Sequence, residues 1–284
     1  MKEIIDDLRT FVNSLNRIIK LVNAYNKTKE NPVDNAYLLE KNIGEIERLI
    51  SELPDFELKN RLNTWLKKEK QGVETFKEDF RFKFGKELTA LFSNEGKKIK
   101  GQYPLIRVGF YTLKLDFQFG QATLFFGPEI EKIKSKISLQ PKVIFETIKK
   151  YDNDLNMMKS TPEEIFKGLY KAYSNRIKLA NKSFGEKLLI TDVLNEYVML
   201  KQSRKFFVDP QKTHFHEYSR VKLSYMLYLL RKSNLLERGI KLYVATFDAT
   251  IDKMNSIWIL ENEDGEGTHY SHISFDPALC CRKQ

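Results

Sequence analysis

Cysteine is nearly absent from this chain of 284 residues, whose only two cysteines are the adjacent Cys280 and Cys281. Neighbouring cysteines near one end cannot staple distant segments to each other, so a disulfide framework is excluded. Long apolar runs are missing as well, because the longest candidate, Tyr225 to Leu230, falls well short of the roughly 18 residues that a membrane span requires. The first residues carry acids where an export signal would continue its apolar run. We therefore expect a soluble, cytoplasmic protein that makes no membrane contact.

The sequence also lacks the motifs of nucleotide-driven and nucleophilic enzymes. It has no Gly-x-x-x-x-Gly-Lys-[Ser/Thr] phosphate loop, no Gly-x-Gly-x-x-Gly and no Gly-x-Ser-x-Gly. A Glu-x-Lys of the kind sought in metal-dependent nucleases occurs at Glu57 to Lys59, but in a segment of helical pattern. Asp248 and Asp252 lie in a predicted turn, where aspartate ordinarily serves as a turn former. We therefore favour a protein without a cofactor and without catalytic activity of its own.

Apolar and aromatic residues, in contrast, are plentiful. Hydrophobic residues make up 42% of the chain and aromatic residues 12%, which is ample material for a packed interior and argues against global disorder. The length exceeds the roughly 100 to 150 residues of a typical domain. A polar, aperiodic stretch from Tyr151 to Ser160 separates two halves. We predict two domains, residues 1–155 and 156–284.

An amphipathic helix pattern opens the chain. Apolar residues at alternating spacings of four and three fall on one stripe of a helix with a coiled-coil seam: Ile4, Leu8, Phe11, Leu15, Ile18, Val22 and Tyr25. A second seam runs from Leu39 to Leu53 between two proline breaks, and a third helical pattern runs from Phe56 to Phe92. We predict that the first two helices form an antiparallel hairpin. The group is either the core of a helical bundle or a coiled coil that binds partners.

The apolar period then changes from helical to alternating. Leu113 to Phe119 and Ala122 to Phe126 predict a β-hairpin with a two-residue turn at Gly120-Gln121, and a strand near Leu105 to Val108 precedes it. We expect a small antiparallel sheet of about three strands, followed by helices near Glu129 to Ser138 and Lys142 to Tyr151. The predicted fold class is therefore α+β and mainly helical, with coiled-coil-like N-terminal helices and a small antiparallel β-sheet.

The second half has the element order of a winged helix. Thr161-Pro162-Glu163-Glu164 supplies an N-cap, a proline at the first helical position and acids at the positive helix end. The expected elements are helices to Ala180, over Thr191 to Gln202 and over Tyr218 to Ser233, then strands over Ile240 to Phe247 and Ser256 to Glu261. In a winged helix the third helix lies in the major groove. The connector from Ser203 to Glu217 is nevertheless long for a helix-turn-helix, and the same element order occurs in protein-interaction modules.

Positive charge is concentrated in this half. The chain has a net charge of +10, and the segment from Lys201 to Lys241 alone has ten basic and three acidic residues, a local excess of seven. Clustered cations of this kind are typical of a phosphate-facing surface. The residues that we predict to contact nucleic acid are Arg204, Lys205, Lys212, Arg220, Lys222, Arg231, Lys232 and Lys241.

The histidines form the other chemical cluster. All four lie near the C-terminus, as His214 and His216 and as His269 and His272, with Asp276 and the two cysteines close behind. Two histidines on one face of an extended segment could bind zinc, although this spacing is unspecific. A zinc site built from them would make a metal-dependent phosphodiesterase or nuclease possible.

We therefore predict a nucleic-acid-associated adaptor subunit of a multi-protein assembly. Its partners would be nucleic acid, most simply duplex DNA, bound by the winged-helix-like module, and other protein subunits bound by the N-terminal helices. One alternative is a protein-interaction scaffold whose basic stretch is only solvated surface. The other is the histidine-based metallohydrolase.

Overall fold

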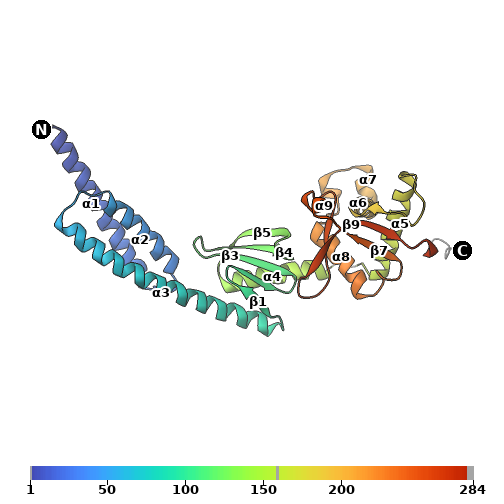
Figure 1. Cartoon of the computed structure of the whole chain (residues 1–284), viewed down its shortest axis with the longest axis horizontal. Coiled ribbons are helices and arrows are strands. Elements are labelled where there is room, and N and C mark those ends of the chain that lie inside the picture. Colours follow the sequence, from blue (N-terminus) through green and yellow to red (C-terminus); the bar gives the residue numbers. More distant parts are fainter. Residues whose placement is uncertain (1, 158–159, 280–284) are drawn as a thin grey trace. The chain divides into compact units, whose positions relative to one another are not determined.

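The computed structural model describes residues 2–157 and 160–279. The chain has an α+β fold in which helices predominate (Figure 1). It divides into two compact units, which we call the helical unit and the mixed unit. The helical unit comprises Met1–Gly96, Asp116–Gln121 and Ser138–Val143, and the mixed unit comprises Lys97–Leu115, Ala122–Ile137 and Ile144–Gln284. The predicted domain boundary after residue 155 stays a prediction about independent folding.

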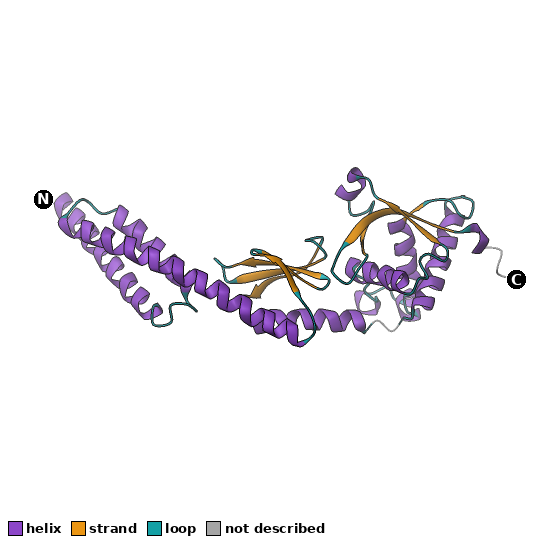
Figure 2. Cartoon of the chain, turned by 60° about the horizontal axis from the view of Figure 1, so that its bottom comes forward, coloured by secondary structure: helices purple, strands orange, loops and turns teal. Residues whose placement is uncertain are grey.

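Three long helices build the helical unit and lie side by side (Figure 2). They confirm the three helices predicted from periodicity, and the third runs unbroken across Gln71 and Gly72. Their bounds are α1 Lys2–Thr28, α2 Ala36–Ser51 and α3 Glu57–Asn94. Their shared core contains Ile18, Tyr25, Leu39, Ile43, Ile46, Leu49, Ile50, Leu53, Leu66 and Val73. Whether this packing has coiled-coil geometry stays a prediction.

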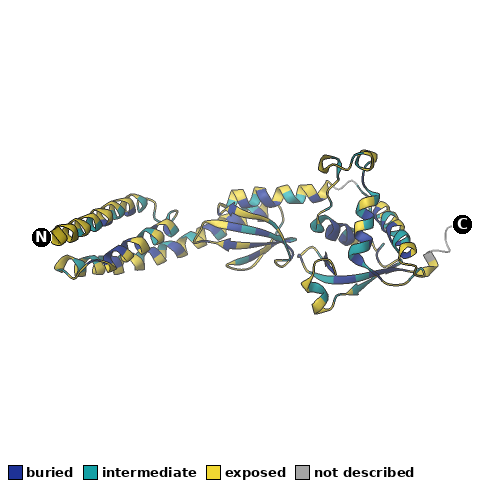
Figure 3. Cartoon of the chain, turned by 90° about the horizontal axis from the view of Figure 1, so that it is seen from above, coloured by how far each residue is buried: buried dark blue, intermediate teal, exposed yellow. Residues whose placement is uncertain are grey.

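The apolar stripe of α1 is only partly covered. Ile18 and Tyr25 are buried, whereas Ile4 and Leu8 are 62% and 58% exposed. Figure 3 shows the beginning of α1 as mostly exposed. The covered part is fixed by a polar contact, because the Tyr25 hydroxyl and the Lys29 ammonium both donate to Glu69 Oε2 at 2.6 Å. The helical unit therefore buries the second half of the predicted seam and leaves its first turns without a cover.

A five-stranded sheet follows, in place of the predicted three strands. The hairpin of β3 and β4 and the strand β2 confirm the prediction, although the turn occupies residues 117–120 rather than Gly120-Gln121. The strands pair in sequence order: β1 Ile99–Gln102, β2 Leu105–Val108, β3 Tyr111–Asp116, β4 Gln121–Phe126 and β5 Glu131–Ser138. The helix predicted over residues 129–138 is wrong, because this segment is β5. Ile133 and Ile137 are four residues apart, a spacing that suits one face of a helix and one face of a strand equally.

The tip of the β3–β4 hairpin belongs to the helical unit. Phe117 in the tip is buried, and its ring lies 5.8 Å from that of Phe84 and 6.3 Å from that of Phe80, both on α3. It also stacks on Tyr37 of α2 with the ring centroids 5.7 Å apart. Three aromatic rings thus pack around Phe117 at the hairpin tip, each at a distance typical of favourable aromatic contacts.

The rest of the mixed unit begins with α4 and contains a second sheet. The predicted helices are confirmed, and the Thr161 capping box is present, with Glu164 as its acidic partner. The helices are α4 Pro141–Asn156, α5 Pro162–Leu179, α6 Ile190–Leu200, α7 Arg204–Val208, α8 Arg220–Lys232 and α9 Phe247–Ile251, with short 3₁₀ turns η1 Lys212–His214 and η2 Pro277–Leu279. The strands are β6 Leu188–Leu189, β7 Ile240–Val244, β8 Ile257–Leu260 and β9 Gly267–Phe275.

Strand β9 organises this second sheet. It pairs antiparallel with β6, β7 and β8, and the strand order is β6-β9-β7. Only β7 and β8 were predicted, so the expected two-stranded end of the chain is corrected to four strands. The strand β6 spans two residues, too few for any periodicity to reveal.

Adjacent isoleucines in α1 allow a direct test of the seam. Ile18 is 4% exposed and Ile19 is 57% exposed. Because a buried carboxyl group without partners is strongly disfavoured, Ile18→Asp should lower the free energy of unfolding by about 3 kcal/mol. Ile19→Asp, which adds the same residue to the same helix, should change it by less than about 0.5 kcal/mol. Urea unfolding followed by circular dichroism measures both, and equal effects would contradict the packed seam.

Candidate nucleic-acid interface

Helix α8, expected to lie in a DNA groove, is a core helix of the mixed unit. Its residues from Leu223 to Tyr228 are all buried. It begins at Ser219, whose hydroxyl accepts a hydrogen bond from the Lys222 amide at 3.2 Å. The helix packs along β8, where the Leu260 amide donates to the Ser224 hydroxyl at 3.0 Å. Little of α8 is therefore open to solvent (Figure 3).

Arg220 at the start of α8 is bonded on all three of its guanidinium nitrogens. Nε donates to Glu131 Oε1 on β5 at 2.7 Å, Nη1 to the Lys253 carbonyl at 2.8 Å, and Nη2 to the Ser256 carbonyl at 2.6 Å. Lys253 completes the group with an ion pair to the other oxygen of Glu131 at 2.7 Å. The Arg220 and Glu131 side chains are only 27% and 16% exposed, so this cluster serves the packing of the mixed unit.

The two cations at the other end of α8 also have internal partners. Arg231 forms an ion pair with Glu261 at 3.1 Å and donates to the Tyr270 hydroxyl at 3.2 Å. Lys232 forms an ion pair with Glu263 at 2.6 Å, and this pair is exposed. Three of the eight predicted contact residues are thus hydrogen-bonded to groups of the chain itself.

The connector between α6 and α8 carries the largest group of predicted residues that stay available. Arg204, Lys205 and Lys212 are exposed, and within residues 2–157 and 160–279 none of them has a carboxylate partner. Next to them, Phe207 and Val208 are 60% and 78% exposed. Cations beside exposed apolar side chains can contact phosphates and stack on sugars or bases.

The connector is an ordered loop, and hydrogen bonds join the residues at its two ends. Gln202 Nε2 donates to the His216 carbonyl at 3.1 Å, and the His216 amide donates back to Gln202 Oε1 at 2.8 Å. Within the connector, the rings of Phe206 and Phe215 lie 5.4 Å apart, and His214 Nδ1 lies 3.0 Å from the Asp209 carbonyl. These contacts hold α7 and η1 in one arrangement.

The remaining two predicted cations lie apart from the connector. Lys222 is in the first turn of α8 and lines a cavity, and no carboxylate of the described residues pairs with it. Lys241 is on β7, with its ammonium 5.3 Å from the centre of the Tyr243 ring. The eight predicted residues therefore lie on the connector, at the two ends of α8 and on β7.

The histidines give no metal site in the part of the chain that the structure describes, where no group of three or more His, Cys, Asp or Glu residues is placed to hold an ion. His269 and His272 are both on β9, and the register of the β7–β9 pairing shifts between Tyr270 and His272. Burial, together with the charge of Arg220, lowers the pKa of His269. The predicted companions Cys280 and Cys281 lie outside the described residues.

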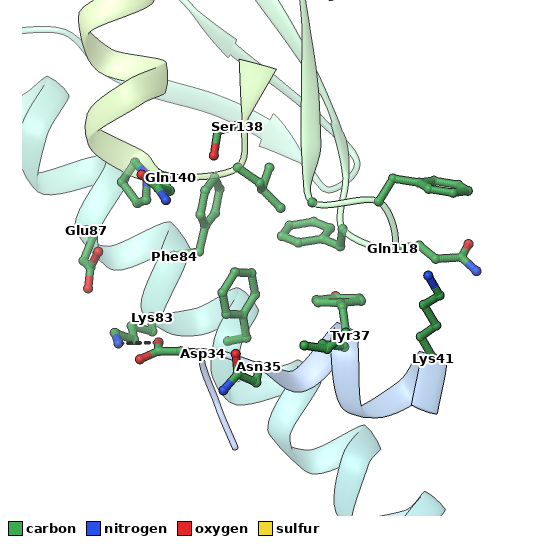
Figure 4. Close-up of a pocket in the computed structure, with 17 residues that line it drawn as sticks. Asp34, Asn35, Tyr37, Lys41, Lys83, Phe84, Glu87, Gln118, Ser138 and Gln140 are labelled. Carbon is green, nitrogen blue, oxygen red and sulfur yellow. Dashed lines mark hydrogen bonds and ion pairs between the residues drawn. The ribbon is translucent and has the colours of Figure 1, made fainter. Parts of the chain in front are cut away.

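Sequence reasoning missed the cavities of the structure, among them one in each unit. One, of about 540 Å³, lies within the helical unit beside the hairpin tip (Figure 4). Its aromatic wall includes Tyr37, Phe84 and Phe117, Lys41 points toward Gln118 at one end, and Asp34 and Lys83 form an ion pair of 2.7 Å at the other. The other, of about 630 Å³, lies in the mixed unit and contains Lys222. No sequence motif marks either one, because their walls come from segments far apart in the chain.

Comparison of the chain with models of protein families, with curated proteins and with solved structures finds no match. None of the described helices is both long enough and apolar enough to cross a bilayer. The functional interpretation therefore depends on the geometry of the chain's own residues.

Arg220 is largely buried and paired, and Arg204 is exposed. Replacing each in turn tests whether the first serves packing within the chain and the second is free to contact a partner. Arg220→Ala should lower the free energy of unfolding by about 2 to 4 kcal/mol, because it leaves the half-buried Glu131 carboxylate without its best partner. Arg204→Ala removes the same charge from an exposed site without an acidic neighbour, so the change should stay below about 0.5 kcal/mol. Thermal and urea unfolding of both variants measure this, and a stable Arg220→Ala protein would contradict a packing role.

Proposed function

We propose that this protein is a nucleic-acid-associated adaptor that holds the phosphate backbone of duplex DNA with the connector between α6 and α8. The proposal depends on three exposed cations of that connector that have no carboxylate partner in the described chain: Arg204, Lys205 and Lys212. Neutralising a phosphate releases condensed counterions, and only cations that are not already neutralised give the full gain. The exposed Phe207 beside them can lie against a sugar or a base edge.

Topology supports a winged-helix-like module in this proposal. From α5 onward the helices and strands follow in the order α5, β6, α6, α7, α8, β7, α9, β8 and β9. Within it, α5, β6, α6, α8, β7 and β9 follow the element order of a winged helix, and the short α7 and α9 and the strand β8 are additions to it. The short β6, between the first two helices, joins the pair that follows the third helix in the order β6-β9-β7. In this version of the module, α8 supports the interface from within, and the long connector in front of it makes the contacts.

The cations paired within the chain contribute less to this interface. Arg220, Arg231 and Lys232 would have to exchange a carboxylate or carbonyl acceptor for a phosphate, so each would gain only the difference between two similar interactions. Lys222 and Lys241 have no such partner in the described chain and can add to the connector's attraction. Because phosphate contacts position a protein without reading sequence, we propose binding with little sequence preference.

The adaptor's second attachment would use exposed apolar surface. The first turns of α1 expose Ile4, Ile5 and Leu8, and the segment around α9 exposes Val244, Phe247, Ile251 and Met254. Clustered exposed apolar residues are typical of protein–protein contacts. They also favour the second candidate function, a scaffold that binds only proteins. The two functions differ in whether the chain binds DNA in a salt-dependent way.

The salt dependence of binding separates these functions. The triple change Arg204→Ala, Lys205→Ala and Lys212→Ala should flatten the slope of log K against log salt by about 2.7, since each lost phosphate contact accounts for roughly 0.9. Fluorescence anisotropy with a labelled DNA duplex and the full chain measures the slope. Absence of binding at low salt would favour the scaffold.

The control variant is Lys67→Ala, Lys68→Ala and Lys86→Ala. These lysines are exposed on α3 and form no ion pair or hydrogen bond in the described chain, and the variant lowers the net charge by the same amount as the connector variant. It should leave the slope nearly unchanged. Arg231→Ala with Lys232→Ala should also have little effect on the slope, because both side chains are already paired. Equal loss in all three variants would indicate diffuse attraction to a basic protein and would overturn the proposed interface.

A further inference from the structure

A cavity of about 630 Å³ lies in the mixed unit and is independent of the connector. Four elements surround it: β3 supplies Tyr111, α4 supplies Tyr151, Asp154 and Leu155, β5 supplies Lys132 and Ile133, and the beginning of α8 supplies Ser219, Val221 and Lys222. This volume is within the range of roughly 300 to 1,000 Å³ that small-molecule sites occupy. The walls combine apolar side chains with a few polar groups, as such sites usually do.

Two lysines face this cavity with their charges unneutralised. Lys132 and Lys222 both line it, and neither has a carboxylate partner among residues 2–157 and 160–279. Their neighbour Arg220 is bonded on all three guanidinium nitrogens. Glu131 thus neutralises Arg220, whereas Lys132 and Lys222 keep their charges. These two charges favour the binding of an anion in the cavity.

The start of α8 adds to that character. Ser219, Val221 and Lys222 lie at the N-cap and in the first turn of a helix of 13 residues, and all three line the cavity. The amides of a first turn carry the partial positive charge of the helix and favour a bound anion. This feature reinforces the two lysines.

Tyr111 adds a buried polar residue to the wall. It lines the same cavity and is only 2% exposed. Its hydroxyl faces the Asp152 carboxylate, which together with burial raises the pKa of Tyr111, so the hydroxyl keeps its proton.

The rest of the wall contains an acidic residue and several apolar or aromatic residues, and these limit the class of ligand that the cavity can bind. Asp154 can accept hydrogen bonds from hydroxyl or amino groups, whereas Tyr151, Ile133 and Leu155 suit a flat, weakly polar ring. A bare inorganic anion would use only the lysines. A ligand that uses all of these groups has a phosphate, hydroxyl or amino donors, and a ring.

We propose that this cavity binds a phosphate ester of the size of a nucleoside monophosphate, with its phosphate held by Lys132 and Lys222. Its ring lies against Tyr151 and the apolar wall, and its sugar hydroxyls donate to Asp154. The site shares Lys222 with the proposed DNA-binding surface but does not depend on the cations of the connector.

Isothermal titration of the full chain with adenosine 5′-monophosphate, adenosine and inorganic phosphate tests the site. We expect the monophosphate to bind more tightly than either of the other two. Lys132→Gln with Lys222→Gln should weaken its binding by roughly a hundredfold, because each lost charge-assisted hydrogen bond corresponds to about tenfold. No saturable binding of the monophosphate at millimolar concentration would overturn the proposal, as would equal affinity for inorganic phosphate.

Matched variants separate the site from general charge and folding effects. Lys98→Gln with Lys134→Gln removes the same charge from exposed positions, Lys134 being two residues from Lys132 on β5, and should leave binding unchanged. The connector triple variant should bind the monophosphate normally. Equal weakening by both lysine pairs would overturn the site.

Discussion

The placement of Arg220 is the constraint on which the mixed unit depends. One guanidinium joins the start of α8 to Glu131 on β5 and to the carbonyls of Lys253 and Ser256 ahead of β8. Because the fork is planar and rigid, it fixes the position of all three segments at once. It thereby sets Ser219 and Lys222 at the edge of the larger cavity and lowers the pKa of His269. It also removes the first cation of α8 from any external role.

Most helices could be predicted from the sequence because their signals are local. The stripe ending at Tyr25, the proline breaks and the Thr161 capping box all act within a few residues. Strands depend on partners elsewhere in the chain, and β5 was predicted as a helix because its two isoleucines satisfy either period. Strand β9 was not predicted, although its β-branched and aromatic residues favour a strand.

The sequence predicted where the basic segment of the candidate interface lies, but not which of its cations are available for binding. Local charge located the basic segment correctly, but pairing decides which of its cations are available, and pairing is set by the fold. Glu131 lies 89 positions from Arg220, and Glu263 lies 31 positions from Lys232. No window along the sequence connects them. The length of the connector does not suit a helix-turn-helix, and its predicted cations Arg204 and Lys212 are exposed.

The reciprocal hydrogen bonds between Gln202 and His216 have a consequence for how this surface can change. They close the connector at the point where it leaves the core. Substitutions within the connector therefore alter its contacts with binding partners and have little effect on folding. Even doubling the length of such a loop costs only about 0.6 kcal/mol of closure entropy. Relatives of this chain could therefore carry connectors of different length and charge on the same three helices, and acquire new binding preferences without redesigning the scaffold beneath.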